Sequence, residues 1–210
     1  MTEVSYKGGN CVVIQTKNTT VVTDPKVEGI KVSKTVAKAQ AQLVTQPTYR
    51  AVGDDDQKVF DFPGEYEVGD FSITGVDAKA QLRADEVSVM YRIVSPDATF
   101  AVIGHVNPDM ITEEQLEKLG VIDVLIIPVG GNGYSIDPHG AVVLTRKIGP
   151  KVVIPVHFKE DGVAYEVEQL SVELFEKELA APVTNESALK IKQPGQLDES
   201  LQIVRLDKTA

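Results

Sequence analysis

The side chains best able to do chemistry in this sequence are three histidines, His105, His139 and His157, and the single cysteine, Cys11. Neutral imidazole and thiolate bind zinc and other transition metals, and either group can act as a base or nucleophile. Cys11 lies in an apolar strand pattern, which favours a buried, unreactive thiol. His139 lies in the first turn of an expected helix, where surface exposure is the simplest interpretation. No Gly-x-Ser-x-Gly motif occurs, and three histidines leave little scope for a catalytic triad.

Two loops contain residue types that bind ions in other proteins. The loop Gly130-Gly131-Asn132-Gly133 precedes an expected helix and could offer backbone amides to an anion. It lacks the Lys-Ser/Thr of a phosphate loop, so a flexible rim loop is favoured. The run Asp54-Asp55-Asp56 could attract a divalent cation, but consecutive side chains diverge, and we expect a solvated loop. Asp24 precedes a proline at a strand end, where it is expected to organise a loop through backbone amides.

The second half of the chain alternates helical periods with apolar strands, an order typical of α/β proteins. Thr112 to Gln115 fits a helix-starting capping box, and Gly120 fits the glycine that ends that helix. Asp137-Pro138 and Gly149-Pro150 are start and stop signals for a second helix. We expect strands over 121–129, 151–156, 188–191 and 202–204, and an amphipathic helix over 163–179.

The first half is richer in strands. Lys17-Asn18 separates two β-rich runs, which predicts a hairpin over 10–15 and 19–23. A helix over 32–42 is expected to lead into the strand Leu43-Val44-Thr45. Turn signals then divide a mostly antiparallel sheet into strands over 58–60, 64–68, 71–76, 87–93 and 99–103.

Composition and charge restrict the class of protein. The 210 residues, 42% of them hydrophobic and 25% charged, suit one globular domain over residues 1–210, because no stretch reads as a linker. A net charge of −10 repels polyanions, so nucleic acid and anionic membranes are poor partners. The longest apolar run has only the length of a strand, so no membrane-spanning helix is expected. The first residues lack a signal-peptide pattern, and one cysteine agrees with a reducing compartment, so we expect a cytoplasmic protein.

Four parts of the chain carry motifs that together resemble a known family. They are 10–14 with 21–25, which has an Asp-Pro turn; 62–68; 123–131 with 135–137; and 150–158. Their order resembles the metallo-β-lactamase superfamily, in particular its small bacterial branch of predicted Zn-dependent hydrolases similar to the ascorbate-lactone hydrolases. The match covers most of the chain. The resemblance implies an α/β fold, a four-layer αβ/βα sandwich with the metal site at one edge between two sheets.

The resemblance also implies a metal motif that this chain does not keep. The family's dinuclear site uses a His-x-His-x-Asp-His run after a Val-Thr strand end, so that zinc can lower the pKa of its bound water to about 7. Here the run after Thr45 is Gln46-Pro47-Thr48-Tyr49-Arg50-Ala51. Gln46 and Thr48 thus replace two histidines, Arg50 replaces the aspartate, and Ala51 replaces the last histidine. None can serve as its predecessor did, and Arg50 would place a permanent cation where the metals bind.

The remaining ligand positions keep few donors. The family's middle histidine falls near Ala80, and His105 stands in the place of its bridging aspartate. His157 alone matches a family ligand in both type and context. The two imidazoles could share a pocket and hold a metal weakly with an acid or water. The favoured alternative is two partly buried histidines that are hydrogen-bonded to neighbouring groups, because two ligands rarely retain zinc.

These observations favour a protein without a cofactor that is not an enzyme but a binding or assembly module, acting through the old cleft or a sheet edge. Its vestigial site comprises Asp24, Gln46, Thr48, Arg50, Ala51, His105, Asp137 and His157.

Two other functions stay open. One is a metal-dependent hydrolase, with zinc, acting on a small ester, lactone or phosphodiester at a site rebuilt around His105, His157 and one or more acids such as Asp137. The other is metal-free binding of an anionic metabolite that Arg50 neutralises. The resemblance also suggests a homo-oligomer, whereas the sequence does not identify a protein or small-anion partner.

Overall fold

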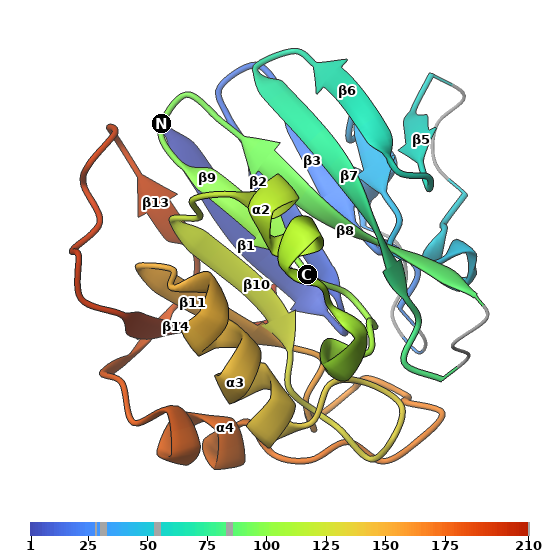
Figure 1. Cartoon of the computed structure of the whole chain (residues 1–210). Helices are drawn as coiled ribbons and strands as arrows, with labels where there is room; N and C mark the ends of the chain where they lie inside the picture. Colours follow the sequence, from blue (N-terminus) through green and yellow to red (C-terminus); the bar gives the residue numbers. More distant parts are fainter. Residues whose placement is uncertain (28, 30–32, 53–55, 83–85, 210) are drawn as a thin grey trace.

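Two mixed β-sheets pack face to face and form the centre of the molecule in this computed structural model (Figure 1). The structure describes residues 1–27, 29, 33–52, 56–82 and 86–209. The expected helix start at Val32 and the first two residues of the run Asp54-Asp55-Asp56 lie outside these ranges.

One sheet has six strands and the other has eight, among the described residues. In spatial order, the six-stranded sheet consists of β13 (Leu189–Ile191), β1 (Thr2–Gly8), β2 (Cys11–Gln15), β3 (Thr20–Thr23), β4 (Ala41–Leu43) and β5 (Lys58–Phe60). The eight-stranded sheet consists of β12 (Val183–Glu186), β14 (Gln202–Leu206), β11 (Val152–Val156), β10 (Val124–Pro128), β9 (Thr99–Val102), β8 (Val87–Val94), β7 (Phe71–Lys79) and β6 (Gly64–Val68).

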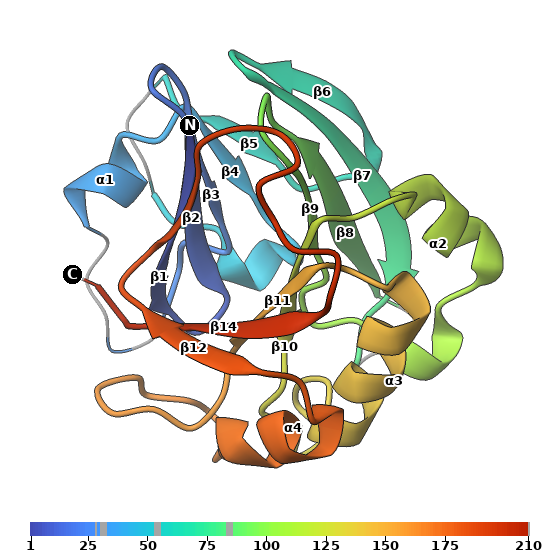
Figure 2. The same ribbon diagram turned by 90° about the vertical axis from the view of Figure 1, so that its left-hand side faces the viewer.

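Helices cover the outer faces of both sheets. The short helix α1 (Lys34–Ala37) lies over the six-stranded sheet, where Val36 and Ala39 pack against Cys11, Val13 and Val22. Three helices lie on the other side of the molecule, against the eight-stranded sheet (Figure 2): α2 (Glu113–Leu119), α3 (Pro138–Ile148) and α4 (Val172–Leu179). The layers therefore follow the order helix, sheet, sheet, helices, and the expected αβ/βα sandwich is confirmed.

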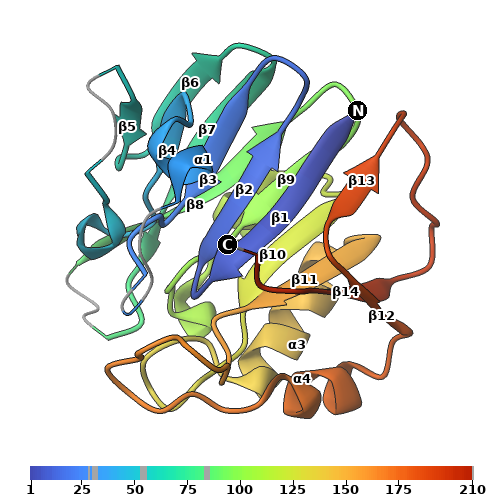
Figure 3. The ribbon, with the colours of Figure 1, turned by 180° about the vertical axis from the view of Figure 1, so that it is seen from behind.

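The burial pattern explains why these segments form strands. β10 and β11 are buried at every position, as expected for parallel strands covered on both faces. β1 instead alternates buried and half-buried residues, which is the two-residue period of a strand with one face on the core. Figure 3 shows how the end of the chain contributes to both sheets, since β13 lies beside β1 whereas β12 and β14 extend the other sheet.

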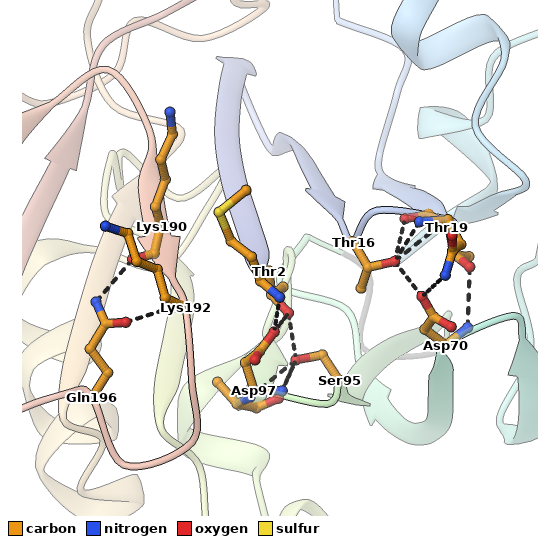
Figure 4. Close-up of polar contacts among 12 residues, drawn as sticks. Thr2, Thr16, Thr19, Asp70, Ser95, Asp97, Lys190, Lys192 and Gln196 are labelled. Atoms are coloured by element: carbon orange, nitrogen blue, oxygen red, sulfur yellow. Dashed lines mark hydrogen bonds and ion pairs between the residues drawn. The ribbon is translucent and has the colours of Figure 1, made fainter.

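Polar contacts join the two sheets at the ends of their strands. Thr2 in β1 donates from Oγ1 to Asp97 in the turn between β8 and β9, at 2.7 Å (Figure 4). Thr16, after β2, donates from Oγ1 to Asp70 in the turn between β6 and β7, at 2.6 Å. β3 and β9 run from these turns toward Asp24 and His105. The contacts therefore lie at the opposite end of the sheets from those two residues.

The local sequence signals were accurate where capping chemistry was involved. Thr112 and Gln115 form the expected capping box, Asp137 caps α3 by accepting from the Gly140 amide, and Gly149 ends that helix in the left-handed conformation. Both expected helices with weak start signals were too long. The helix over 32–42 is reduced to α1, and the helix over 163–179 begins only at Val172.

In the part of the chain that the structure describes, no helix is long and apolar enough to cross a membrane.

Candidate functional site

Four polar side chains follow the carboxyl ends of strands at one edge of the molecule. Asp24 follows β3 and Thr45 follows β4, and these two strands run parallel. His105 and His157 follow β9 and β11, which lie parallel on either side of β10. The carboxyl ends of parallel strands meet at the same edge of a sheet, where α/β proteins commonly place their sites. The Gln46 amide links the two sheets by donating to the His105 carbonyl at 3.3 Å.

The imidazoles of His105 and His157 lie together at this edge. Their ring centroids are 4.4 Å apart, and the rings meet edge to face. Both side chains are buried, and His105 Nε2 has no hydrogen-bond partner among the described residues. Burial lowers the pKa of His105, and the neighbouring His157 lowers it further. Burial also lowers the pKa of His157 to about 4. Both rings are therefore neutral at physiological pH.

Hydrogen bonds fix the orientation of His157. Its backbone amide donates to the Gly9 carbonyl at 2.9 Å, and its Nδ1 lies 3.1 Å from Gln169 Oε1. The Gln169 Nε2 donates to the Val167 carbonyl at 2.6 Å, so Oε1 is the atom that faces the imidazole. Nδ1 of His157 accordingly carries the proton, and Nε2 keeps its lone pair.

Three tyrosines surround the histidine pair. The Tyr49 hydroxyl is hydrogen-bonded to His105 Nδ1 and lies 3.3 Å from the Tyr134 hydroxyl. The Tyr134 ring stacks on His157 with centroids 5.7 Å apart, and the Tyr165 ring lies 4.6 Å from His157. Tyr49 comes from the 3-10 turn η1 (Pro47–Tyr49), whereas the other two come from the loops after β10 and β11. Loops from both sheets thus enclose the two imidazoles in aromatic rings.

Asp24 is buried beside this cluster. Its carboxylate accepts from the Thr45 amide and from Thr45 Oγ1, both at 2.7 Å. Burial raises the pKa of Asp24 to about 7, although the bonds from Thr45 and the amide of Asn10 oppose the shift. The sequence expectation that Asp24 organises a loop through a backbone amide agrees with this geometry.

A cavity of about 70 Å³ opens beside His157. Asn10, Asp24, Tyr49, Tyr134, His157 and Tyr165 are among the residues that line it. Asn10 is 6% exposed. Its Nδ2 interacts with the Asp24 carboxylate, whereas its Oδ1 has no hydrogen-bond partner in the described part of the chain. Buried polar atoms are seldom left unpaired, because each loses its hydration without compensation. The Oδ1 of Asn10 is therefore available to a hydrogen-bond donor inside the cavity.

The structure brings only part of the expected vestigial site together. Asp24, Thr48 and His157 line the cavity, and Gln46 contacts His105 as described. Ala51 is buried elsewhere, with its amide and carbonyl both bonded to the Gln42 side chain.

Two expected site residues are placed differently. Arg50 ends η1 with an exposed side chain and is not part of the cavity lining, so it does not occupy a metal position. Asp137 is exposed and caps α3. His139 is exposed as expected and pairs with Glu178 at 2.5 Å.

This donor set does not fit a two-metal hydrolytic centre. The described residues contain no group of three or more His, Cys, Asp or Glu side chains placed to hold a metal ion. Catalytic zinc sites use three protein ligands and a water. Two imidazoles lie here, and Tyr49 already binds Nδ1 of one of them. Burial raises the pKa of Tyr49 and of Tyr165, so neither phenol ionises easily to supply another ligand.

The family follows from comparison with known sequences. A sequence model of the Beta-lactamase superfamily domain matches residues 3–157, well over half of the chain. The chain belongs to the metallo-β-lactamase superfamily. The matched region runs from Glu3 in β1 to His157 and confirms the family and fold implied by the sequence motifs.

One curated protein is similar over a shorter range. A UPF0173 metal-dependent hydrolase from Thermodesulfovibrio yellowstonii is 32% identical over 82 residues. That match spans 38% of this chain and 29% of the length of the relative.

Several solved structures are similar to this chain over most of its length. A superfamily protein from Thermotoga maritima has a TM-score of 0.76 at 22% identity, covering 99% of this chain and 100% of its own. The metallo hydrolase Igni18 from Ignicoccus hospitalis has a TM-score of 0.62 at 14% identity, covering 85% and 90%. YhfI from Bacillus subtilis, a metallo-β-lactamase fold protein, has a TM-score of 0.61 at 9% identity, covering 97% and 96%. At these identities the similarity establishes the fold alone.

The sequence did not lead us to predict the three tyrosines of this site. Tyr49 lies inside the run that was aligned with the metal motif, and Tyr134 directly follows the glycine-rich loop. Tyr165 lies in a segment expected to be helical. Half of the six tyrosines in the chain meet in this one place. Tyr134 and Tyr165 lie in the loops that follow β10 and β11, and this position was the sequence signal that could have identified them.

Proposed function

We propose that this superfamily member is a binding protein that uses no catalytic metal and takes a small polar molecule into the cavity beside His157. The observation that carries the proposal is the buried Oδ1 of Asn10, which lines the cavity and has no hydrogen-bond partner among the described residues. A ligand that donated a hydrogen bond to this oxygen would relieve its desolvation penalty in the free protein.

The surroundings of the histidines support a role without metal. The imidazoles that remain are neutral, are packed ring to ring, and are enclosed by Tyr49, Tyr134 and Tyr165. Binding of an anionic metabolite is not favoured, because Arg50, the residue expected to neutralise the anion, is exposed and does not line the cavity. Lys26, which lines the cavity, is also exposed.

A metal-dependent hydrolase is the second candidate, and one observation favours it. His105 Nε2 is unpaired among the described residues, and the adjacent His157 keeps a lone pair on its own Nε2. The curated relative from Thermodesulfovibrio yellowstonii is a metal-dependent hydrolase. This alternative requires metal ligands besides the two histidines, such as water or an acidic side chain that moves toward them.

Replacing Asn10 with leucine tests the proposed function. The variant removes the unpaired Oδ1 but also the contact of Nδ2 with Asp24, and these two effects oppose each other. We therefore expect the free energy of unfolding to change by no more than about 1 kcal/mol. A thermal-shift screen of small polar metabolites, run with a chelator, should give ligands that stabilise the wild type. The same ligands should not stabilise Asn10→Leu.

Asn18→Leu is the matched control, since Asn18 is exposed in the β2–β3 turn at the far end of the sheets. It should keep every ligand response of the wild type. If no metabolite stabilises the wild type, or if Asn10→Leu responds as the wild type does, the cavity is not the binding site that we propose.

A further inference from the structure

Aromatic rings form much of the cavity wall. Tyr49, Tyr134, His157 and Tyr165 all line it, and they come from three separate segments of the chain. The rings of Tyr134 and His157 are nearly parallel, at 19°, and Tyr165 is tilted by 51° from His157. The cavity wall therefore includes aromatic surface from four side chains.

The charges around the rings favour a cation. Asp24 and Glu166 both line the cavity. Their carboxylates therefore place negative charge beside the aromatic rings. Lys26 opposes this field, but its exposed side chain can extend its ammonium group into water. The net charge of −10 also attracts cations to the molecule.

Size and polarity restrict the ligand further. A cavity of about 70 Å³ is large enough for about five water molecules, and so for a compact head group rather than a long chain. Asn10 Oδ1 supplies one unpaired acceptor for a polar substituent on that group. Neutral tyrosine faces attract a cation through their quadrupole, and methylated ammonium groups are the ligands that such aromatic cages recognise.

We propose that the cavity binds the ammonium head group of a small organic cation, with quaternary or methylated nitrogen preferred. This inference rests on the proposed function, because it assigns the metal-free cavity to one class of ligand. The positive methyl groups would contact Tyr134, Tyr165 and His157, and Glu166 and Asp24 would balance the charge. No covalent step is involved.

Isothermal titration with a matched pair of probes tests the charge requirement. Choline and 3,3-dimethylbutan-1-ol have the same shape and differ in a positive nitrogen or a neutral carbon. Choline should bind the wild-type protein in chelator at least about tenfold more tightly than the alcohol, as a cation–π site requires. Equal affinity, or no measurable binding of choline, would overturn the inference.

Variants of Tyr134 test whether its aromatic ring is responsible for binding the cation. Tyr134→Leu should weaken choline binding about tenfold, whereas Tyr134→Phe, which keeps the ring, should stay within about twofold of the wild type. If Tyr134→Leu does not fold, the exposed Glu166→Gln substitution replaces it and should weaken binding about threefold. Unchanged affinity in the folded variants would overturn the assignment.

The outcomes separate this inference from the proposed function. One outcome is that choline shows no binding, while an uncharged metabolite binds the wild type in chelator but does not bind Asn10→Leu. In that case the cation assignment is wrong and the metal-free binding function stands. If the purified protein holds a stoichiometric metal, the proposed function itself is wrong.

Discussion

Asp24→Asn is expected to make the protein more stable than the wild type at alkaline pH, by an amount that shrinks as the pH falls. The carboxylate of Asp24 is buried, and its pKa is raised to about 7 from an ordinary value of 3.8. Asparagine can keep the geometry, because its Oδ1 accepts from the Thr45 amide and its Nδ2 can donate to Thr45 Oγ1.

The sign of the effect follows from proton binding. Between pH 3.8 and about 7 the folded state holds the Asp24 proton that the unfolded state has lost. Stability of the wild type therefore falls as the pH rises through this range, by about 1.4 kcal/mol per pH unit at most. Asp24→Asn lacks this loss, so its stability relative to the wild type should rise by about 2–3 kcal/mol between pH 5 and pH 8.

Urea denaturation of both proteins at several pH values measures this difference. Asp161→Asn, at an exposed aspartate, reports the background effect of removing one surface carboxylate. A difference between Asp24→Asn and the wild type that stays constant from pH 5 to pH 8 would show that Asp24 is ionised throughout, contrary to its buried position.

Gly104→Ala is expected to lower the free energy of unfolding by at least about 3 kcal/mol. Gly104 has a φ of +65°, and a Cβ there would lie 2.5 Å from Thr45 Cβ. Thr45 cannot move aside easily, because Asp24 binds both its amide and its hydroxyl. The backbone conformation accounts for about 1–2 kcal/mol, and the collision accounts for the remainder.

Gly133→Ala separates the two contributions. Gly133 has a φ of +75° but no atom within 4 Å of an added Cβ, so its substitution carries only the conformational cost, about 1 kcal/mol. Urea denaturation of the two variants gives the comparison. Equal destabilisation would mean that the chain after β9 does not approach Thr45 as closely as the structure shows.

Much of the fold could be predicted because its signals are local. The capping box at Thr112, the Asp137-Pro138 helix start and the apolar strands before the two buried histidines each depend on a few neighbouring residues. β5 and β6 have the expected bounds, 58–60 and 64–68. β12 was missed because all four of its residues are exposed, so its sequence has no alternation of polar and apolar positions.

Tertiary contacts determine the conformation of the segment 163–171. Its apolar spacing resembles that of a helix, yet the Leu170 amide donates to the Gly130 carbonyl and the Leu170 carbonyl accepts from the Lys159 amide. These bonds hold the segment as a loop against the glycine-rich loop. Val163 and Tyr165 then line the cavity. Periodicity alone does not report such long-range bonds.

The candidate site was only partly visible in the sequence. The positions of Asp24, His105 and His157 follow from their places at strand ends, and the structure brings the two histidines into contact. The direction of Arg50 depends on one residue at the end of a 3-10 turn, and the rings of Tyr134 and Tyr165 depend on how two loops close. Nothing in the local sequence determines those directions.

The metal content of the purified protein tests the central claim most directly. Two enclosed imidazoles with no third protein donor in the described residues should not retain an ion, so mass spectrometry after purification without added metal should find less than roughly a tenth of an equivalent of Zn, Fe or Mn. One or two equivalents that are lost in His157→Ala would contradict the claim and support the hydrolase.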